Sequence, residues 1–457
     1  MGHIGNVKDE YRAWVQRLAA GTTGAPEPAT PGAWEGWREV LEILCTPEQA
    51  WLASRLPVLP ATLEKVAART GLSARELLPK LEALCDRGIV LDLIDPRTGE
   101  TTYFLAPSVI GFFEFSMMRA HDGLPKKRLA EAMEAYFRGD ETLAREVFGF
   151  ATQVGRALVN EESLDDGATP EVLDWERATA LIREARSIGV SLCYCRHKAQ
   201  HLGQACDAPT ENCLSIGDGA GFVLRRGFAR PIERSEALQI LDQARERGLV
   251  QIADNVRSQP SYICNCCGCC CGQLQAITVY GLHAVNPSAF VPRLSGERCS
   301  GCGLCAKACS ICALELVPAG SGERRDARPR IDPERCIGCG VCASRCARKA
   351  LRMAPREDRT SRSTRSSGSS GRRSSAGGSP TSSSTRAPAV ARSSSTACSR
   401  PWGICHRPSE PWPTSSSARA LSESRSSRCA SPRSKSAARS GYRGTSAGQD
   451  GARRGPD

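Results

Sequence analysis

A short run of cysteines constrains this chain more than any other feature. In YICNCCGCCCGQL, residues 262–274, six of the eight residues from Cys264 to Cys271 are cysteine. A chain of 457 residues can bury a sizeable core, so disulfides are not needed to hold it together. The start MGHIGNVKDE lacks the pattern of a secretory signal, and no apolar run approaches a membrane span. We therefore expect a cytoplasmic protein without a membrane span, whose clustered thiols are metal ligands or redox groups.

Two further cysteine runs, CSGCGLCAKAC and CIGCGVCASRC, share the spacing C-x2-C-x2-C-x3-C. Their cysteines are Cys299, Cys302, Cys305 and Cys309 in the first run, and Cys336, Cys339, Cys342 and Cys346 in the second. The short loop lets three thiolates reach three irons of one cubane. Gly301, Gly303, Gly338 and Gly340 allow the backbone to turn closely around such a cluster and to point amides at its sulfurs.

This doubled spacing resembles that of the bacterial two-cluster ferredoxins, over residues 293 to about 354. In that family the fourth cysteine of each run binds the other cluster. The resemblance implies one [4Fe-4S] cluster on Cys299, Cys302, Cys305 and Cys346, and a second on Cys336, Cys339, Cys342 and Cys309. Zinc is the alternative, although four-cysteine zinc sites usually pair C-x2-C knuckles from separate segments. Ser310 and Ala347 replace the usual proline after each fourth cysteine, and Cys312 is additional.

Ten thiols remain upstream of these runs, enough for two further iron-sulfur clusters at four ligands each. They are Cys193, Cys195, Cys206, Cys213, Cys264, Cys266, Cys267, Cys269, Cys270 and Cys271. Side chains alternate along an extended segment, which puts Cys264, Cys266 and Cys270 on one side and Cys267, Cys269 and Cys271 on the other. Each side then offers three ligands at most. We therefore expect the 193–213 and 264–271 loops to pack together and to share at least one cluster.

Other interpretations of these loops stay open. They can hold zinc, or form vicinal disulfides on oxidation. His197 and His201 are candidate ligands of a mixed His/Cys site, although loop histidines are more often solvated. Arg196 and Lys198, beside Cys195, are expected to lower the pKa of the thiol and to favour an anionic cluster or a bound anion. GDGAGF at 217–222 is a weak nucleotide signal, because the pattern shows no strand before it and no helix after it.

The N-terminal half is expected to be mainly helical. Helical periodicity over residues 33–56 is followed by a short helix that ends at Gly71, a helix with a Ser73–Glu76 capping box, and a hairpin in GIVLDLIDPRTGETTYFLA. This order resembles a winged helix-turn-helix domain over residues 40–107. The candidate DNA-reading helix has balanced charges, so docking within the protein or onto a protein partner is favoured over nucleic-acid binding. Cys45 and Cys85 lie on apolar helix faces and are expected in the core.

The net charge of +12 belongs to the C-terminal tail alone. From Arg356 onward there are 18 arginines and one lysine against six acidic residues, whereas residues 1–355 have 42 basic and 43 acidic residues. This Ser/Arg-rich tail has too few apolar residues to bury and is expected to be disordered. It is either an arm that binds RNA or phosphate, or the product of a shifted reading frame in a GC-rich gene.

Together these features predict an α+β fold in four parts. These are a helical, winged-helix-like domain (1–120), a helical domain with cysteine-rich loops (121–290), a two-cluster ferredoxin-like domain (291–355) and a disordered tail (356–457). The motifs CYCRHK, CDAPTENC and ICNCCGCCC, followed by the ferredoxin pattern, resemble a group of uncharacterised iron-sulfur binding proteins of anaerobic or metabolically versatile bacteria, over roughly residues 30–355.

Electron transfer between two unidentified redox protein partners is the function that this pattern favours. Nothing in the sequence supplies a flavin or nicotinamide site, and no catalytic residues stand out. Two alternatives stay open. One is a redox- or oxygen-sensing regulator that uses the winged-helix-like region, and the other is an oxidoreductase whose unusual cluster has an open iron site.

Overall fold

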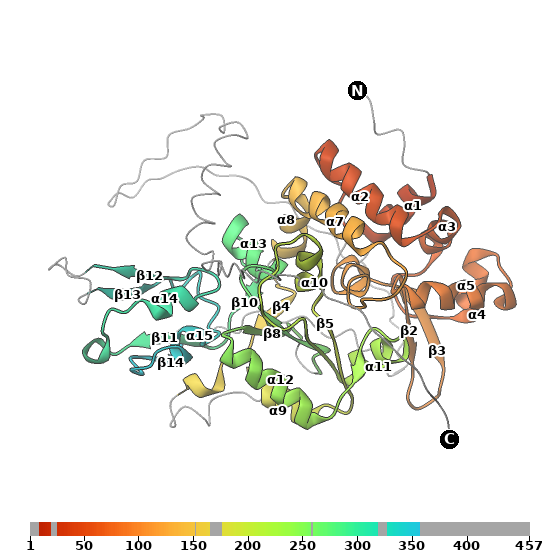
Figure 1. Ribbon diagram of the computed structural model, residues 1–457. Coiled ribbons are helices and arrows are strands. Elements are labelled where there is room, and N and C mark those ends of the chain that lie inside the picture. The colour runs from red at the N-terminus through yellow and green to blue at the C-terminus, as the bar shows by residue number, and fades with distance from the viewer. Residues whose placement is uncertain are drawn as a thin grey trace, which may run out of the picture.

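The computed structural model describes residues 9–19, 25–150, 152–164, 176–256, 259–318 and 327–356. Except for Arg356, the predicted disordered tail lies outside these residues. In the part of the chain that is described, no helix is long and apolar enough to cross a membrane. The N-terminal helices and the C-terminal cysteine runs lie at opposite ends of the molecule, with a sheet between them (Figure 1).

The N-terminal part contains the predicted helices and hairpin. The helices are α1 (Asp9–Ala19), α2 (Pro31–Leu44), α3 (Pro47–Arg55), α4 (Leu63–Thr70) and α5 (Ala74–Asp86), and the strands are β1 (Ala61–Thr62), β2 (Val90–Ile94) and β3 (Thr101–Leu105). The strands form an antiparallel sheet in the order β1-β3-β2. The capping box is confirmed, because Ser73 and Glu76 exchange side-chain to backbone hydrogen bonds. Gly71 ends α4 in the left-handed conformation, with a φ of 74°.

An aromatic core joins these helices to the next three, α6 (Phe113–Phe115), α7 (Lys126–Gly139) and α8 (Thr142–Phe148). Trp37 of α2 stacks on Tyr136 of α7 with ring centroids 4.6 Å apart. The two helices approach closely at Gly36, where an added Cβ would lie 2.7 Å from the carbonyl oxygen of Ala132. Cys45 and Cys85 are buried in this core, as predicted.

A seven-stranded sheet fills the centre of the molecule, so the prediction of a helical domain over residues 121–290 is wrong. Its strands are β4 (Gly155–Ala157), β5 (Ile188–Leu192), β6 (Glu211–Ile216), β7 (Arg230–Pro231), β8 (Val250–Asp254), β9 (Tyr262–Cys266) and β10 (Val285–Asn286). They lie in the order β10-β4-β8-β9-β6-β5-β7, and all neighbours except β10 and β4 are antiparallel. Most of these strands are buried on both faces, so their sequences lack the apolar-polar alternation that predicts a strand.

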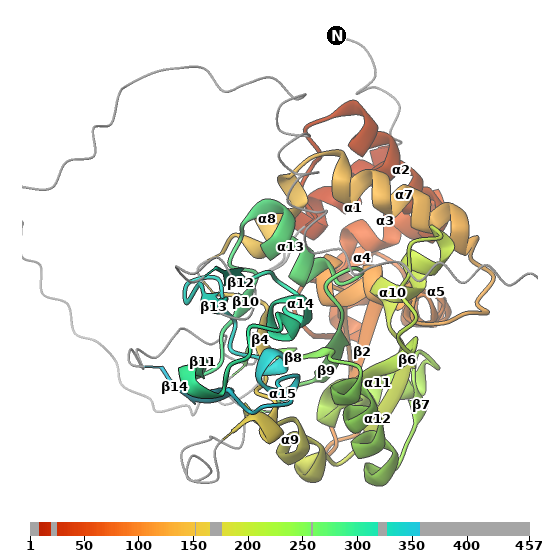
Figure 2. The same ribbon diagram turned by 60° about the vertical axis from the view of Figure 1, so that its left-hand side comes forward.

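Helices cover both faces of this sheet (Figure 2). Helices α9 (Ala178–Glu184) and α12 (Arg234–Glu246) pack on the face that contains Ile263 of β9. Helix α13 (Gly272–Tyr280) packs on the opposite face, which contains Cys266. Successive residues of β9 therefore serve two different cores.

Two more helices follow strands of this sheet directly, α10 (Tyr194–His201) after β5 and α11 (Gly217–Arg225) after β6. The GDGAGF motif therefore directly follows a strand and forms the start of a helix, contrary to the sequence-based expectation. Packing explains one of its glycines, because a Cβ at Gly219 would lie 2.5 Å from the Cβ of Ser261.

The C-terminal segment is built from two similar halves. Its elements are β11 (Phe290–Leu294), α14 (Leu304–Ala308), β12 (Leu314–Val317), β13 (Arg328–Ile331), α15 (Val341–Ser344) and β14 (Leu351–Pro355). Strand β11 pairs with β14 and β12 pairs with β13, both antiparallel. The second pair lies between the two cysteine runs, and the residues that connect its strands lie outside the described ones.

Arg226, at the end of α11, fastens the N-terminal part to the sheet. Its guanidinium pairs with Glu82 and Asp86 of α5, at 2.6 and 3.1 Å, and with Asp92 of β2 at 2.9 Å. The side chains of Arg226 and Asp92 are only 11% and 6% exposed. Removing the arginine would leave a buried carboxylate without this partner.

We expect Arg226→Ala to lower the free energy of unfolding by about 1.5–3 kcal/mol, because the buried carboxylate of Asp92 loses one of its two arginine partners and keeps only Arg225. Arg145→Ala is the control, since its pair with Glu141 is more than half exposed, and its loss is expected to cost about 0–1 kcal/mol. Urea unfolding of the full chain checks both values. Equal losses in the two variants would contradict this account of Arg226.

Candidate metal centres

The eight cysteines of the C-terminal segment lie on tightly turned loops and on the short helices that follow them. Gly301, Gly303, Gly338 and Gly340 all have positive φ, between 65° and 78°, as their predicted role requires. Gly303 and Gly340 immediately precede α14 and α15, which carry Cys305 and Cys342. The same backbone conformation therefore occurs in both halves of the segment.

The fourth cysteine of each run lies among thiols of the other run. Burial raises the pKa of Cys339 to about 12, and the nearby Cys309 and Cys336 add to this rise. Burial also raises the pKa of Cys305, with contributions from Cys302 and from Cys346. Cys309 therefore lies near thiols of the second run, and Cys346 near those of the first.

Backbone amides donate hydrogen bonds to the sulfurs of Cys309 and Cys346, the fourth cysteine of each run. The amide of Ala313 donates to Sγ of Cys309 at 3.2 Å, and the amide of Ala350 donates to Sγ of Cys346 at 3.2 Å. Such bonds stabilise a thiolate and tune a bound cluster. Cys312 does not repeat a ligand position, because its counterpart in the second half is Lys349, and both residues have positive φ.

Six of the ten upstream thiols form a second group, which we call the six-thiol group: Cys193, Cys195, Cys213, Cys264, Cys266 and Cys271. The pairing of β6 with β9 creates its centre. Leu214 is opposite Ile263, so the same antiparallel register places Cys213 opposite Cys264. Cys193 and Cys271 directly precede α10 and α13, so both lie at helix N-termini, where the helix dipole favours negative charge.

Neighbouring thiols of the six-thiol group shift each other's pKa. Cys193 and Cys271 act on the pKa of Cys195, and Cys264 and Cys271 raise that of Cys266. Hydrogen bonds from Cys195 and Cys266 lower the pKa of Cys271 to about 5. These thiols therefore lie near one another, and the group includes members of both cysteine-rich loops.

The remaining four upstream thiols form a compact cluster, the four-thiol group: Cys206, Cys267, Cys269 and Cys270. All four sulfurs lie within 4.8 Å of one another. The Cys206 and Cys267 sulfurs are 3.6 Å apart, and those of Cys269 and Cys270 are 3.7 Å apart. One loop supplies Cys206 and the turn after β9 supplies the other three, so the two loops meet here as well.

The division of the 264–271 run differs from its prediction at two positions. Alternation correctly separates Cys264 and Cys266 from Cys267, because β9 is extended to Cys266. Residues 268–270 then form a turn, which ends the alternation. As a result Cys270 joins the four-thiol group, and Cys271 joins the six-thiol group.

A fully buried arginine lies between the two groups. Arg196 is 0% exposed, and Nη2 donates to Sγ of Cys267 at 3.4 Å. Nη1 donates to the carbonyl oxygen of Pro209 at 2.6 Å and to Oδ1 of Asn212 at 3.2 Å. Burial lowers the pKa of Arg196, but Cys193 and Cys267 raise it by more. The expected cation beside the thiols is therefore present at Arg196. The predicted lowering of the Cys195 pKa is wrong, because Cys193 lowers it but Cys271 and burial raise it by more.

Two asparagines that the sequence analysis did not single out join the loops. Nδ2 of Asn265 donates to the backbone oxygen of Asn212 at 2.8 Å, and both residues are buried. Asn212 precedes Cys213, and Asn265 lies between Cys264 and Cys266. These positions in the sequence could have identified them. A buried amide between buried thiols needs a hydrogen-bond partner of its own.

The two candidate histidine ligands face away from the thiols and bond elsewhere. Nδ1 of His197 is 2.7 Å from the carbonyl oxygen of Met117, and its Nε2 is 3.2 Å from Nε2 of His201. Lys198 pairs with Glu134 of α7 instead of a cysteine. Among the described residues, the compact metal-binding arrangement consists of cysteines alone.

Residues 298–350 match the 4Fe-4S dicluster domain. The chain therefore contains a 4Fe-4S cluster-binding domain of the ferredoxin type near its C-terminus. No curated protein and no solved structure matches the chain.

The dicluster domain shares one continuous buried core with the six-thiol group. Cys266 and Cys271 pack in the same hydrophobic cluster as Cys305, Cys336 and Cys342. The turn of the four-thiol group also contacts this domain, because an added Cβ at Gly268 would lie 2.5 Å from the carbonyl oxygen of Ser310. The upstream thiols and the dicluster domain are thus packed directly against each other.

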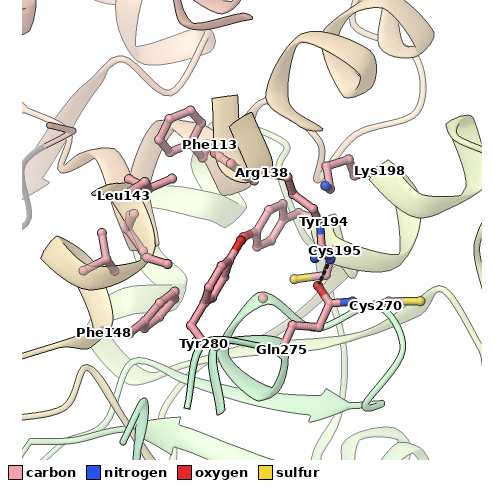
Figure 3. A pocket seen from close by; sticks show the side chains of 16 residues that line it. Phe113, Arg138, Leu143, Phe148, Tyr194, Cys195, Lys198, Cys270, Gln275 and Tyr280 are labelled. Atoms are coloured by element: carbon pink, nitrogen blue, oxygen red, sulfur yellow. Dashed lines mark hydrogen bonds between the residues drawn. The ribbon is translucent and has the colours of Figure 1, made fainter. Parts of the chain in front are cut away.

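An apolar pocket reaches both upstream groups (Figure 3). Phe113, Leu143, Phe148 and Tyr280 line it on one side, and Cys195 and Cys270 lie at its far end. Its polar side chains bond to one another, since Arg138 donates to Oε1 of Gln275 at 2.6 Å and also pairs with Glu134.

We expect Gly268→Ala to lower the free energy of unfolding by about 1–3 kcal/mol, because the added methyl group overpacks the contact with Ser310. Gly32→Ala is the matched control, since nothing lies within 4 Å of a Cβ there, and it is expected to be nearly neutral. Denaturant unfolding under anaerobic conditions measures both. A neutral Gly268→Ala variant would show that the turn does not pack tightly on the dicluster domain.

Proposed function

We propose that this protein transfers single electrons between redox protein partners, through the dicluster domain and a further iron-sulfur cluster on the six-thiol group. One observation carries the proposal: Cys266 and Cys271 share a buried core with ligand cysteines of the dicluster domain. A buried core keeps water out from between the centres, which suits electron transfer from one centre to the next.

In the dicluster domain, the proposed ligands cross between the two runs. One [4Fe-4S] cluster is bound by Cys299, Cys302, Cys305 and Cys346, and the other by Cys336, Cys339, Cys342 and Cys309. The effect of Cys346 on the pKa of Cys305, and of Cys309 on that of Cys339, supports this assignment. It also follows the spacing of two-cluster ferredoxins.

The six-thiol group offers more than the four ligands that a further iron-sulfur cluster needs, and the proposed ligands include Cys266 and Cys271, the two that are buried in the core shared with the dicluster domain. Six neighbouring thiols, two of them buried and four half-buried, require a cationic centre if they are to ionise together. The N-termini of α10 and α13 favour the anionic form of Cys193 and Cys271. Arg196 contributes a buried positive charge beside Cys193.

When bound, iron-sulfur clusters supply one-electron redox chemistry at potentials set by charge, hydrogen bonds to sulfur and solvent exposure. The protein controls each of these properties. The amides of Ala313 and Ala350 donate to sulfur, and the buried core around Cys266 and Cys342 keeps solvent away.

The winged-helix-like region is proposed to act within this protein and not as a DNA reader. The helix that would read DNA, α5, has Glu82 and Asp86 engaged by Arg226. Acidic side chains at this position also repel phosphates. This contact supports a docking role over the regulator that the sequence left open.

Iron and acid-labile sulfide per chain test the proposed cofactors. For the full chain purified without oxygen, the dicluster domain alone predicts about 8 of each, and a four-iron cluster on the six-thiol group raises this to about 12. Cys266→Ser is expected to lower both values by about 4, as is the control Cys342→Ser in the dicluster domain. About 8 sulfides in the wild type, unchanged in Cys266→Ser, would contradict the proposed upstream cluster.

A reductive titration tests electron transfer in the same samples. Each cluster accepts one electron, so the wild type is expected to take up about three electrons per chain and Cys266→Ser about two. The reduced protein should return these electrons to an added one-electron acceptor. Clusters that are present but cannot be reduced and reoxidised would contradict the function while leaving the cofactors in place.

A further inference from the structure

The four-thiol group differs from the other thiol sets in how compact it is. All four sulfurs lie within 4.8 Å of one another, and two pairs are 3.6 and 3.7 Å apart. Four thiolates bound to a single tetrahedral ion at about 2.3 Å have sulfurs about 3.8 Å apart. The observed spacing fits this arrangement.

A [4Fe-4S] cube requires a wider arrangement. Each of its four cysteines binds a different iron at a different corner, so an iron-iron edge and two outward iron-sulfur bonds separate any two cysteine sulfurs. The sulfurs of Cys206 and Cys267 are too close together to hold two separate corners at 3.6 Å. The four-thiol group is therefore too compact for a [4Fe-4S] cluster, one of the centres that the sequence left open for these cysteines.

Arg196 gives an independent indication of negative charge at this place. Its side chain is fully buried, and its hydrogen bonds to described residues go to Pro209, Asn212, Asn265 and Sγ of Cys267, none of which is a carboxylate. A buried guanidinium is stable only near a compensating charge. A divalent ion with four thiolates has a net charge of −2, which supplies it.

We propose that Cys206, Cys267, Cys269 and Cys270 bind one tetrahedral, thiolate-coordinated ion, zinc or ferrous iron, in a closed site without sulfide. Because the protein fills all four positions, the ion binds no substrate and has a structural role. It joins the loop that contains Cys206 to the turn at 268–270. That turn packs on Ser310, next to Cys309 of the dicluster domain.

The metal content of the full chain, relative to its sulfide content, tests this site directly. Cubanes contain iron and sulfide in equal numbers, whereas a single thiolate-bound ion adds metal without sulfide. In protein purified without oxygen, zinc plus iron should therefore exceed acid-labile sulfide by about one per chain. Equal amounts of metal and sulfide would overturn the proposal, whatever the total number of clusters.

A pair of matched variants assigns the extra ion. Cys269 and Cys302 are both exposed thiols, one in the four-thiol group and one in the dicluster domain. Cys269→Ala should lose one metal per chain with sulfide unchanged, whereas Cys302→Ala should lose iron and sulfide together. Loss of sulfide in Cys269→Ala, with the circular dichroism spectrum unchanged, or no loss of metal at all, would overturn the assignment.

Wild-type protein provides the test that does not depend on how a variant folds. If the extra metal is zinc, X-ray absorption at the zinc edge should show four sulfur ligands at about 2.3 Å and no neighbouring metal. If it is iron, Mössbauer spectroscopy should show one high-spin tetrahedral iron apart from the clusters. Zinc with nitrogen or oxygen ligands would overturn the site. Protein that contains no zinc, and whose iron is all in clusters, would overturn it as well. Neither result depends on whether the six-thiol group holds a cluster.

Discussion

The pairing of β6 with β9 is the interaction on which the cysteine-rich centre depends. It places Cys213 opposite Cys264 and thereby brings together two loops that are about fifty residues apart in the sequence. The hydrogen bond from Asn265 to Asn212, and those from Arg196 to both segments, hold this contact. Without it neither upstream group would have its full set of thiols.

The two faces of the sheet have different roles in this pairing. Ile263 anchors β9 in the core formed with α9 and α12, while Cys264 and Cys266 face α13 and the dicluster domain. The strand therefore acts as a partition with an apolar core on one side and thiols on the other. The turn at 268–270 then directs three further thiols to a separate place. In this way one short cysteine run serves two centres of different size and different proposed chemistry.

Local sequence rules predicted the features that depend on a few neighbouring residues. The four glycines of the dicluster domain, the capping box at Ser73 and the hairpin of β2 and β3 follow from backbone chemistry within each segment. The central sheet did not follow, because strands such as β5 and β8 are buried on both faces and lack alternation. Alternation assigned Cys270 and Cys271 each to the wrong thiol group, because it holds only while the strand stays extended. The role of Arg196 between the two thiol groups depends on long-range contacts that no local pattern contains.

The central claim of this account is that the six-thiol group and the dicluster domain form one electron-transfer unit. Electron paramagnetic resonance of the fully reduced full chain tests it most directly, because clusters packed in a common core interact magnetically. The account predicts broadened signals from this interaction, which simplify to those of a two-cluster ferredoxin when Cys266→Ser removes the upstream cluster. A spectrum of the reduced wild type that is identical to that of Cys266→Ser would contradict the claim.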